Sequence, residues 1–158
     1  MMKKLYILIA AVAVALTMGS CGNNVLYDST DKVDESGWLP TDTVAFSVEV
    51  DDTVQLYDFL IEVRNSTTYA YSNLFLFVNT TFPDGSVAYD TLECPLADVA
   101  GQWYGKRVGR YVDSRYRLRS GSARFPMTGT YRFAITNGMR DSAIAGIRDV
   151  GLRIEYSK

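Results

Sequence analysis

Apolar and polar residues alternate with a period of two along most of the chain after residue 42. Residues 44–50 read VAFSVEV and residues 57–63 read YDFLIEV, so that every second side chain is apolar. The same alternation returns at residues 115–119, 131–135 and 150–156. Successive side chains of a strand point to opposite faces of a sheet, so this pattern predicts strands with one buried face.

A continuous apolar run and a turn signal lie between these segments. Residues 74–78 read LFLFV, which predicts a central strand covered on both faces. The FPDGS sequence that follows favours a tight turn, because Pro83 presets φ and Gly85 accepts positive φ. We therefore expect a hairpin that joins this strand to a strand at residues 86–92.

The number of expected strands defines the fold class. Seven or more strands, turn signals about every ten residues and little helical periodicity predict an all-β domain, an antiparallel β-sandwich of which the jelly roll is one form. We assign this sandwich to residues 42–158. Residues 22–41 are polar, and their composition cannot bury much surface. We therefore expect residues 21–41 to form a short tether.

The N-terminus has the pattern of a secretory signal. Lys3 and Lys4 precede an apolar run at residues 5–16, and small residues lead to Cys21. The run is shorter than the roughly 20 residues that a spanning helix needs. A signal of residues 1–20 followed directly by cysteine resembles a bacterial lipobox, which predicts that Cys21 is lipidated and holds the chain to a membrane. The alternative is an ordinary signal peptide with a chance cysteine at its end.

Residue types restrict the possible chemistry. The sequence contains no histidine, which removes the usual serine and cysteine triads and imidazole zinc sites. If Cys21 is acylated, Cys94 has no disulfide partner, and its expected role is a small buried apolar side chain. Asp51 and Asp52 are adjacent and would point to opposite faces of a strand. We expect no enzyme activity, no cofactor and no metal site.

Charge is distributed unevenly along the chain. Residues 22–100 carry a net charge of −12, residues 101–124 a net charge of +6, and residues 125–158 a net charge of +2. Two interpretations are open: the two parts neutralise each other across the fold, or the basic part forms a face for an anionic partner. A nucleic-acid partner is not expected, because the chain after the signal is net acidic and lies outside the cytoplasm.

The basic part contains the candidate partner-binding residues. Trp103 and Tyr104 stand between glycines in GQWYGK, where they could form a stacking platform or an anchor, or where Trp103 could cap the core. Three arginines alternate along one expected strand face and need a negative group opposite them. The candidate surface consists of Trp103, Tyr104, Arg107, Arg115, Arg117 and Arg119.

The ordered series of motifs resembles the GldH family of gliding-motility lipoproteins of the Bacteroidota. The stretches that carry the resemblance are YDFLIEVRNSTTYAYSNLFLFV (57–78), FPDG (82–85), DTLECPLADVAGQWYGK (90–106), GTYRFAITNGMRD (129–141) and IAGIRDVGLRIE (144–155). The resemblance implies a lipid-anchored, non-enzymatic component of the envelope machinery for gliding, with motility or secretion proteins as partners. Only Cys21 carries over as a functional residue.

The resemblance leaves the location and one rival function open. No acidic run follows Cys21 in CGNNVL, which favours the outer membrane with the domain facing the periplasm. The rival hypothesis is a glycan-binding envelope lipoprotein of the same architecture. Exposed aromatic side chains in a groove would favour that rival, whereas a flat charged face with a buried Trp103 would favour a scaffold.

Overall fold

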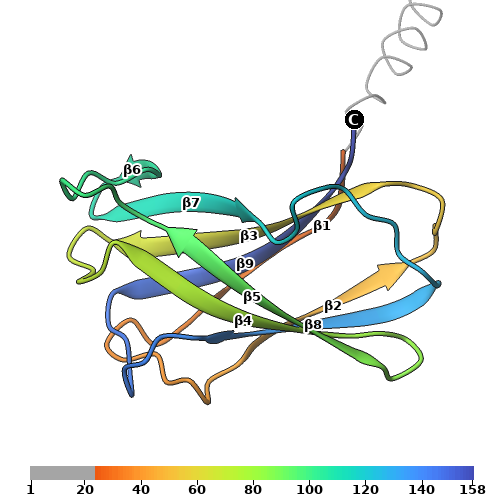
Figure 1. Cartoon of the computed structure of the whole chain (residues 1–158), viewed down its shortest axis with the longest axis horizontal. Coiled ribbons are helices and arrows are strands. Elements are labelled where there is room, and N and C mark those ends of the chain that lie inside the picture. Colours follow the sequence, from red (N-terminus) through yellow and green to blue (C-terminus); the bar gives the residue numbers. More distant parts are fainter. Residues whose placement is uncertain (1–23) are drawn as a thin grey trace, which may run out of the picture.

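In the computed structural model, which describes residues 24–158, the chain forms nine antiparallel strands and no helix (Figure 1). The strands are β1 (Val25–Lys32), β2 (Val44–Val50), β3 (Tyr57–Ser66), β4 (Asn73–Thr81), β5 (Val87–Pro95), β6 (Lys106–Val108), β7 (Tyr111–Arg117), β8 (Gly129–Asn137) and β9 (Ile147–Tyr156). The predicted all-β class is confirmed.

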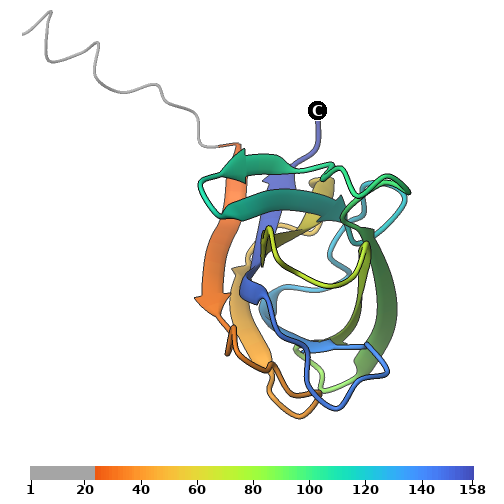
Figure 2. The ribbon, with the colours of Figure 1, turned by 90° about the vertical axis from the view of Figure 1, so that its left-hand side faces the viewer.

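The strands form two sheets that pack face to face. One sheet has five strands in the order β1-β9-β3-β7-β6, and the other has four in the order β2-β8-β4-β5. The chain crosses between the sheets at every connection except the β4–β5 and β6–β7 hairpins. Without the short edge strand β6, this is the strand order of a jelly roll. The two sheets face each other (Figure 2), and the buried hydrophobic core lies between them.

The core follows directly from the alternation in the sequence. In β2 the side chains are alternately buried and exposed from Val44 to Val50. Aromatic rings fill one end of the interior, where the ring of Phe125 lies 5.1 Å from that of Tyr57 and 4.7 Å from that of Tyr131. Such tilted and edge-on pairs add to the stabilisation that burial provides. Cys94 is fully buried, as predicted for a small apolar side chain.

The structure corrects the predicted tether. Residues 25–32 form β1, which pairs along its length with β9 at the edge of the five-stranded sheet. Trp38 is completely buried and pairs with Ile144. A polar composition did not exclude a strand here, because an edge strand needs to bury only part of one face, which Leu26 and Tyr27 do. The predicted signal peptide and Cys21 lie outside the described residues.

Strand β4 corrects a second prediction. The expected hairpin is confirmed, because β4 pairs with β5 from Asn73 to Thr81. However, only one face of β4 is buried, and Phe77 on the outer face is 46% exposed. A run of apolar residues therefore did not mark a strand covered on both sides. No other layer covers the outer face of the four-stranded sheet among the described residues.

The two ends of the sandwich carry different groups of loops. The N-terminal end holds the start of β1, the end of β9 and the loops at 51–56, 82–86 and 118–128. The opposite end holds the loops at 33–43, 67–72, 96–105 and 138–146. The antiparallel register fixes this arrangement, and the C-terminus lies beside the start of β1 (Figure 1).

Candidate functional site

The predicted row of arginines lies on the outer face of the five-stranded sheet. Arg115 and Arg117 project from the same face of β7, as the alternation predicted. Arg115 donates hydrogen bonds of 2.9 and 2.5 Å to Glu62 on β3, its partner in register. Arg117 donates a 2.6 Å bond to Asp58. The acidic part of the chain therefore faces these arginines.

A third arginine links three strands of this face. Arg64 on β3 meets Asp113 on β7 through two hydrogen bonds, of 2.6 and 2.9 Å. Its Nη1 also lies 3.6 Å from Oδ2 of Asp149 on β9. Paired hydrogen bonds between guanidinium and carboxylate fix orientation as well as adding attraction. Arg64 therefore helps to set the register of β3 between its two neighbours.

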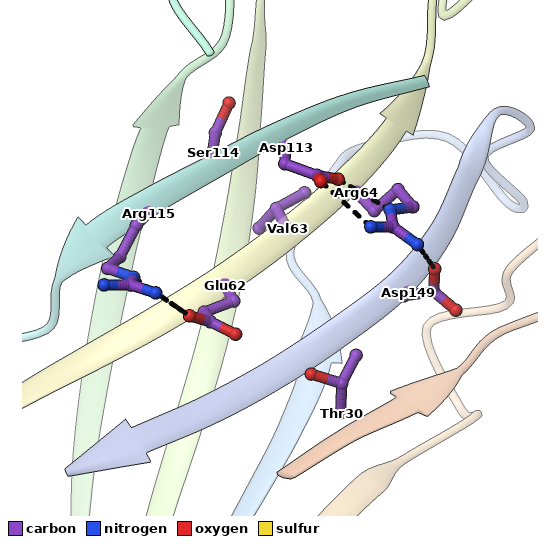
Figure 3. Close-up of a pocket in the computed structure, with 8 residues that line it drawn as sticks. All are labelled: Thr30, Glu62, Val63, Arg64, Asp113, Ser114, Arg115 and Asp149. Atoms are coloured by element: carbon purple, nitrogen blue, oxygen red, sulfur yellow. Dashed lines mark hydrogen bonds and ion pairs between the residues drawn. The ribbon is translucent and has the colours of Figure 1, made fainter. Parts of the chain in front are cut away.

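These ion pairs surround a charged hollow on the outer face (Figure 3). The hollow has a volume of about 560 Å³. Its lining residues are Thr30, Glu62, Val63, Arg64, Asp113, Ser114, Arg115 and Asp149. Gly151 lies between Thr30 and Glu62 in register, and a Cβ there would lie 2.5 Å from the Thr30 hydroxyl oxygen. The glycine therefore permits close packing of the edge strand β1 against β9.

The chemistry of the charged hollow suits a polar ligand better than a simple anion. The guanidiniums of Arg64 and Arg115 already meet carboxylates, so their charge is balanced within the fold. The hollow offers both donors and acceptors, including the Thr30 hydroxyl. A bound anion would also have to approach Glu62 and Asp149, which face the same space.

Two other arginines of the candidate surface lie elsewhere. Arg107 on β6 is opposite Val112, whose side chain is buried, so Arg107 lies on the other face of the sheet from Arg115. Arg119 follows β7 at the N-terminal end, and its Nη2 lies 3.6 Å from Oδ2 of Asp90 on β5. The arginines grouped by sequence are therefore distributed over different surfaces.

The two aromatic candidates lie in the loop at the opposite end. Trp103 is half-buried and packs against the core, and its backbone pairs with Ala97. Tyr104 is 65% exposed, and its N–H donates to the Leu96 carbonyl. The loop therefore holds Tyr104 in the solvent on a backbone fixed by hydrogen bonds. Trp103 is only half-buried, so it neither caps the core completely nor forms a fully exposed stacking platform.

A second aromatic surface lies outside the residues predicted from the sequence. Tyr89 on β5 is 76% exposed, and Phe77 on β4 is partly exposed beside it on the outer face of the four-stranded sheet. Their cross-strand partners are Asn79 and Thr91, respectively. The alternation at residues 87–94 could have revealed Tyr89, because it places Leu92 and Cys94 inward.

Asp58 and Asp113 predict how stability changes in acid. Hydrogen bonds from Arg117 and Ser122 lower the pKa of Asp58, and those from Arg64 lower the pKa of Asp113. Stabilisation from a carboxyl with a lowered native pKa is complete above its ordinary value of 3.8 and is lost as the pH falls through the native value. Each contribution is below about 1 kcal/mol, because the pairs are partly solvated.

We therefore expect the urea midpoint to stay constant from pH 7 to about pH 5 and to fall below about pH 4. The Arg64→Met variant should raise the pKa of Asp113 towards its ordinary value and leave that of Asp58 unchanged. Carboxyl NMR titration measures both. An Asp113 pKa that does not respond to loss of Arg64 would contradict this assignment.

Residues 24–158 also bear on metal binding and membrane crossing. In this range, His, Cys, Asp and Glu side chains form no group of three or more that could hold a metal ion. No helix of these residues is long and apolar enough to cross a membrane. The thiol of Cys94 is enclosed, and burial raises its pKa to about 12.

Comparison with known proteins gives the family. The family model described as GldH lipoprotein matches residues 25–154, from the start of β1 to near the end of β9. The chain belongs to the GldH lipoprotein family. A protein of Christiangramia forsetii named gliding motility lipoprotein GldH homolog is 33% identical over 149 residues, which cover 90% of each chain. The gliding motility lipoprotein GldH of Flavobacterium johnsoniae is 30% identical, covering 89% of this chain and 91% of the relative.

Likeness to solved structures is distant. The mitogen of Yersinia pseudotuberculosis is 8% identical with a TM-score of 0.36, covering 85% of this GldH-family chain and 89% of the mitogen. Dimeric latent PorU of Porphyromonas gingivalis is 9% identical with a TM-score of 0.34, covering 88% of this chain and 14% of PorU. Likenesses at this level say nothing about function.

Proposed function

We propose that this chain is a non-catalytic, lipid-anchored component of the gliding-motility machinery that holds partner proteins at the membrane. The observation that carries the proposal is the family match over residues 25–154, together with relatives named for gliding motility. Motility or secretion proteins of the envelope are the proposed partners.

The proposed anchor is an acyl group on Cys21, which follows a secretory signal in the sequence. Several acyl chains on one residue hold a protein stably, whereas a single chain gives marginal binding. We place the protein at the outer membrane, with the domain facing the periplasm, because no acidic run follows Cys21.

The positions of the carboxylates support a non-catalytic role. Glu49 lies on β2 and Glu93 on β5, at opposite edges of the four-stranded sheet, while Glu62 lies on the other sheet. Three strand spacings separate β2 from β5, or roughly 14 Å. Glycosidases place two carboxyls within about 5–10 Å of each other. These three carboxylates therefore cannot flank one glycosidic bond.

The proposed partner surface centres on Trp103, Tyr104 and Arg107, which we call the distal surface. Tyr104 is the exposed aromatic of this group, and aromatic and arginine side chains often dominate binding energy at protein interfaces. Arg107 donates to the Gly109 carbonyl, and its guanidinium has no carboxylate partner among residues 24–158. Arg115, Arg117 and Arg119 stay in the proposal as half-exposed side chains whose remaining donors could meet a partner.

A double variant, Tyr104→Ala with Arg107→Glu, tests the distal surface. We expect it to retain the circular dichroism spectrum and the unfolding midpoint, because both side chains are exposed. Capture of motility proteins from cross-linked membranes should fall at least about tenfold, as for interface hot spots. The matched control is Tyr89→Ala with Arg132→Glu, which changes the same residue types on the four-stranded sheet. Equal capture by both variants would contradict the assignment.

Glycan binding remains the second candidate, because one observation favours it. Tyr89 and Phe77 are exposed together on a sheet face, beside the side chains of Asn79 and Thr91. Aromatic rings with neighbouring amide and hydroxyl groups can stack against a sugar and bond its hydroxyls. Loss of polysaccharide retention in the Tyr89→Ala, Arg132→Glu control would support this function in place of the scaffold.

A further inference from the structure

The distance from the proposed anchor to the folded domain is short. Three residues separate Cys21 from Val25, the first residue of β1. A chain spans at most about 3.3–3.6 Å per residue, so the Cα atoms of Cys21 and Val25 lie within about 14 Å of each other. Asn24 is itself fixed, since its carbonyl accepts a 3.0 Å bond from Tyr156 N–H. An acyl group on Cys21 must therefore hold the N-terminal end of the sandwich close to the lipid headgroups.

The loops at this end have features suited to such a position. Val54, in the loop between β2 and β3, is 77% exposed, and Leu56 in the same loop is also exposed. Arg124, from the loop between β7 and β8, donates a 2.7 Å hydrogen bond to the Val54 carbonyl. Val54 and Leu56, which we call the apolar tip, are thus held next to the basic side chain of Arg124. This combination is found at membrane interfaces.

An apolar hollow of about 300 Å³ opens beside these loops. Its lining residues are Phe59, Thr80, Phe82, Leu118, Arg119, Ala123, Arg124, Phe125, Pro126, Tyr131 and Phe133. The aromatic side chains of this set pack into the core, and Arg119 and Arg124 are its two charged members. Apolar surface with basic groups beside it complements the boundary between acyl chains and phosphates.

We propose that the N-terminal end of the sandwich is a docking surface for a phospholipid bilayer, with Val54 entering the headgroup region and Arg124 facing lipid phosphates. The proposal rests on the proposed anchoring through Cys21. The occupant of this surface is lipid, because the short length of chain between Cys21 and β1 brings this end of the sandwich, and no other, to the membrane.

Acidic side chains at the same end limit the electrostatic attraction. Asp52 accepts hydrogen bonds from the N–H groups of Val54 and Gln55, and Asp84 accepts one from Ser86 N–H. Asp51 is exposed in the same loop as Asp52. Docking is therefore driven by the acyl anchor and the apolar tip, and we expect it to depend little on salt.

Docking in this orientation places the distal surface on the side of the domain that faces away from the bilayer. The loop that holds Trp103 and Tyr104 lies at the opposite end of the sandwich from β1's first residue (Figure 1). The long axis of the domain then points away from the bilayer. Partners would meet Tyr104 in the aqueous compartment without competing with lipid.

Fluorescence quenching in vesicles tests the docking surface. The acylated full-length lipoprotein is reconstituted into phosphatidylethanolamine–phosphatidylglycerol vesicles as either Val54→Cys or Val99→Cys, labelled with an environment-sensitive fluorophore. Val99 is fully exposed at the opposite end and provides the matched control. Cys94 should not be labelled, because it is buried and its thiol stays protonated.

We expect lipid-bound nitroxide to quench the label at position 54 several-fold more strongly than the label at position 99, and iodide to show the reverse order. Equal quenching of both labels in protein that floats with the vesicles would overturn docking while leaving the anchor intact. Protein that carries no acyl group and does not float would overturn the anchoring on which the proposal rests.

Discussion

Replacing Trp38 by alanine is expected to lower the free energy of unfolding by about 3–5 kcal/mol. The indole is completely buried, and its N–H donates a 2.8 Å bond to the Asp42 carbonyl. The backbone of Trp38 exchanges two hydrogen bonds with Ile144, and its carbonyl also accepts a bond from the Asn137 side chain. Removing the ring would leave a large cavity where the loop after β1 closes one end of the core.

Urea unfolding of the Trp38→Ala protein measures this effect, and Leu39→Ala provides its control. Leu39 is the next residue and is 43% exposed, so its truncation should cost less than about 1 kcal/mol. Similar costs for the two variants would mean that residues 33–43 do not belong to the cooperative unit. The contrast also measures how far the folded domain extends towards the N-terminus.

Alternation along the chain was sufficient to predict most of the sandwich. The expected strand at residues 44–50 coincides with β2, because each inward side chain is buried and each outward one is exposed. This signal is local, since it depends only on which face of a strand meets the core. It could not reveal β1, whose outward residues are polar and whose inward residues are only partly buried.

The ion pairs depend on information that is not local. The sequence predicts that Arg115 and Arg117 share a face, but their partners Glu62 and Asp58 are more than 50 residues away. Those partners follow from the pairing of β3 with β7, which depends on the whole jelly-roll order. Grouping Arg107 with Arg115 by proximity in sequence overlooked the turn between β6 and β7, which places them on different faces.

Replacing Cys21 by serine is expected to abolish acylation of the protein. Serine lacks the thiol that carries the acyl group in the proposed anchor, and the chain has one other cysteine, Cys94. Metabolic labelling with an alkyne fatty acid measures incorporation, with Cys94→Ala as the matched control. The control should keep the label, because the side chain of Cys94 is enclosed in the core. Label that persists in the Cys21→Ser protein would contradict the anchor.

Capture from native membranes tests whether the anchored domain holds motility proteins. The bait carries a C-terminal tag, and mild cross-linking in cells precedes purification, with the Cys21→Ser protein as the control. We expect motility or secretion proteins of the envelope to be recovered with the acylated bait and lost with the control. Recovery of polysaccharide without any protein partner would contradict the scaffold and favour glycan binding at Tyr89 and Phe77.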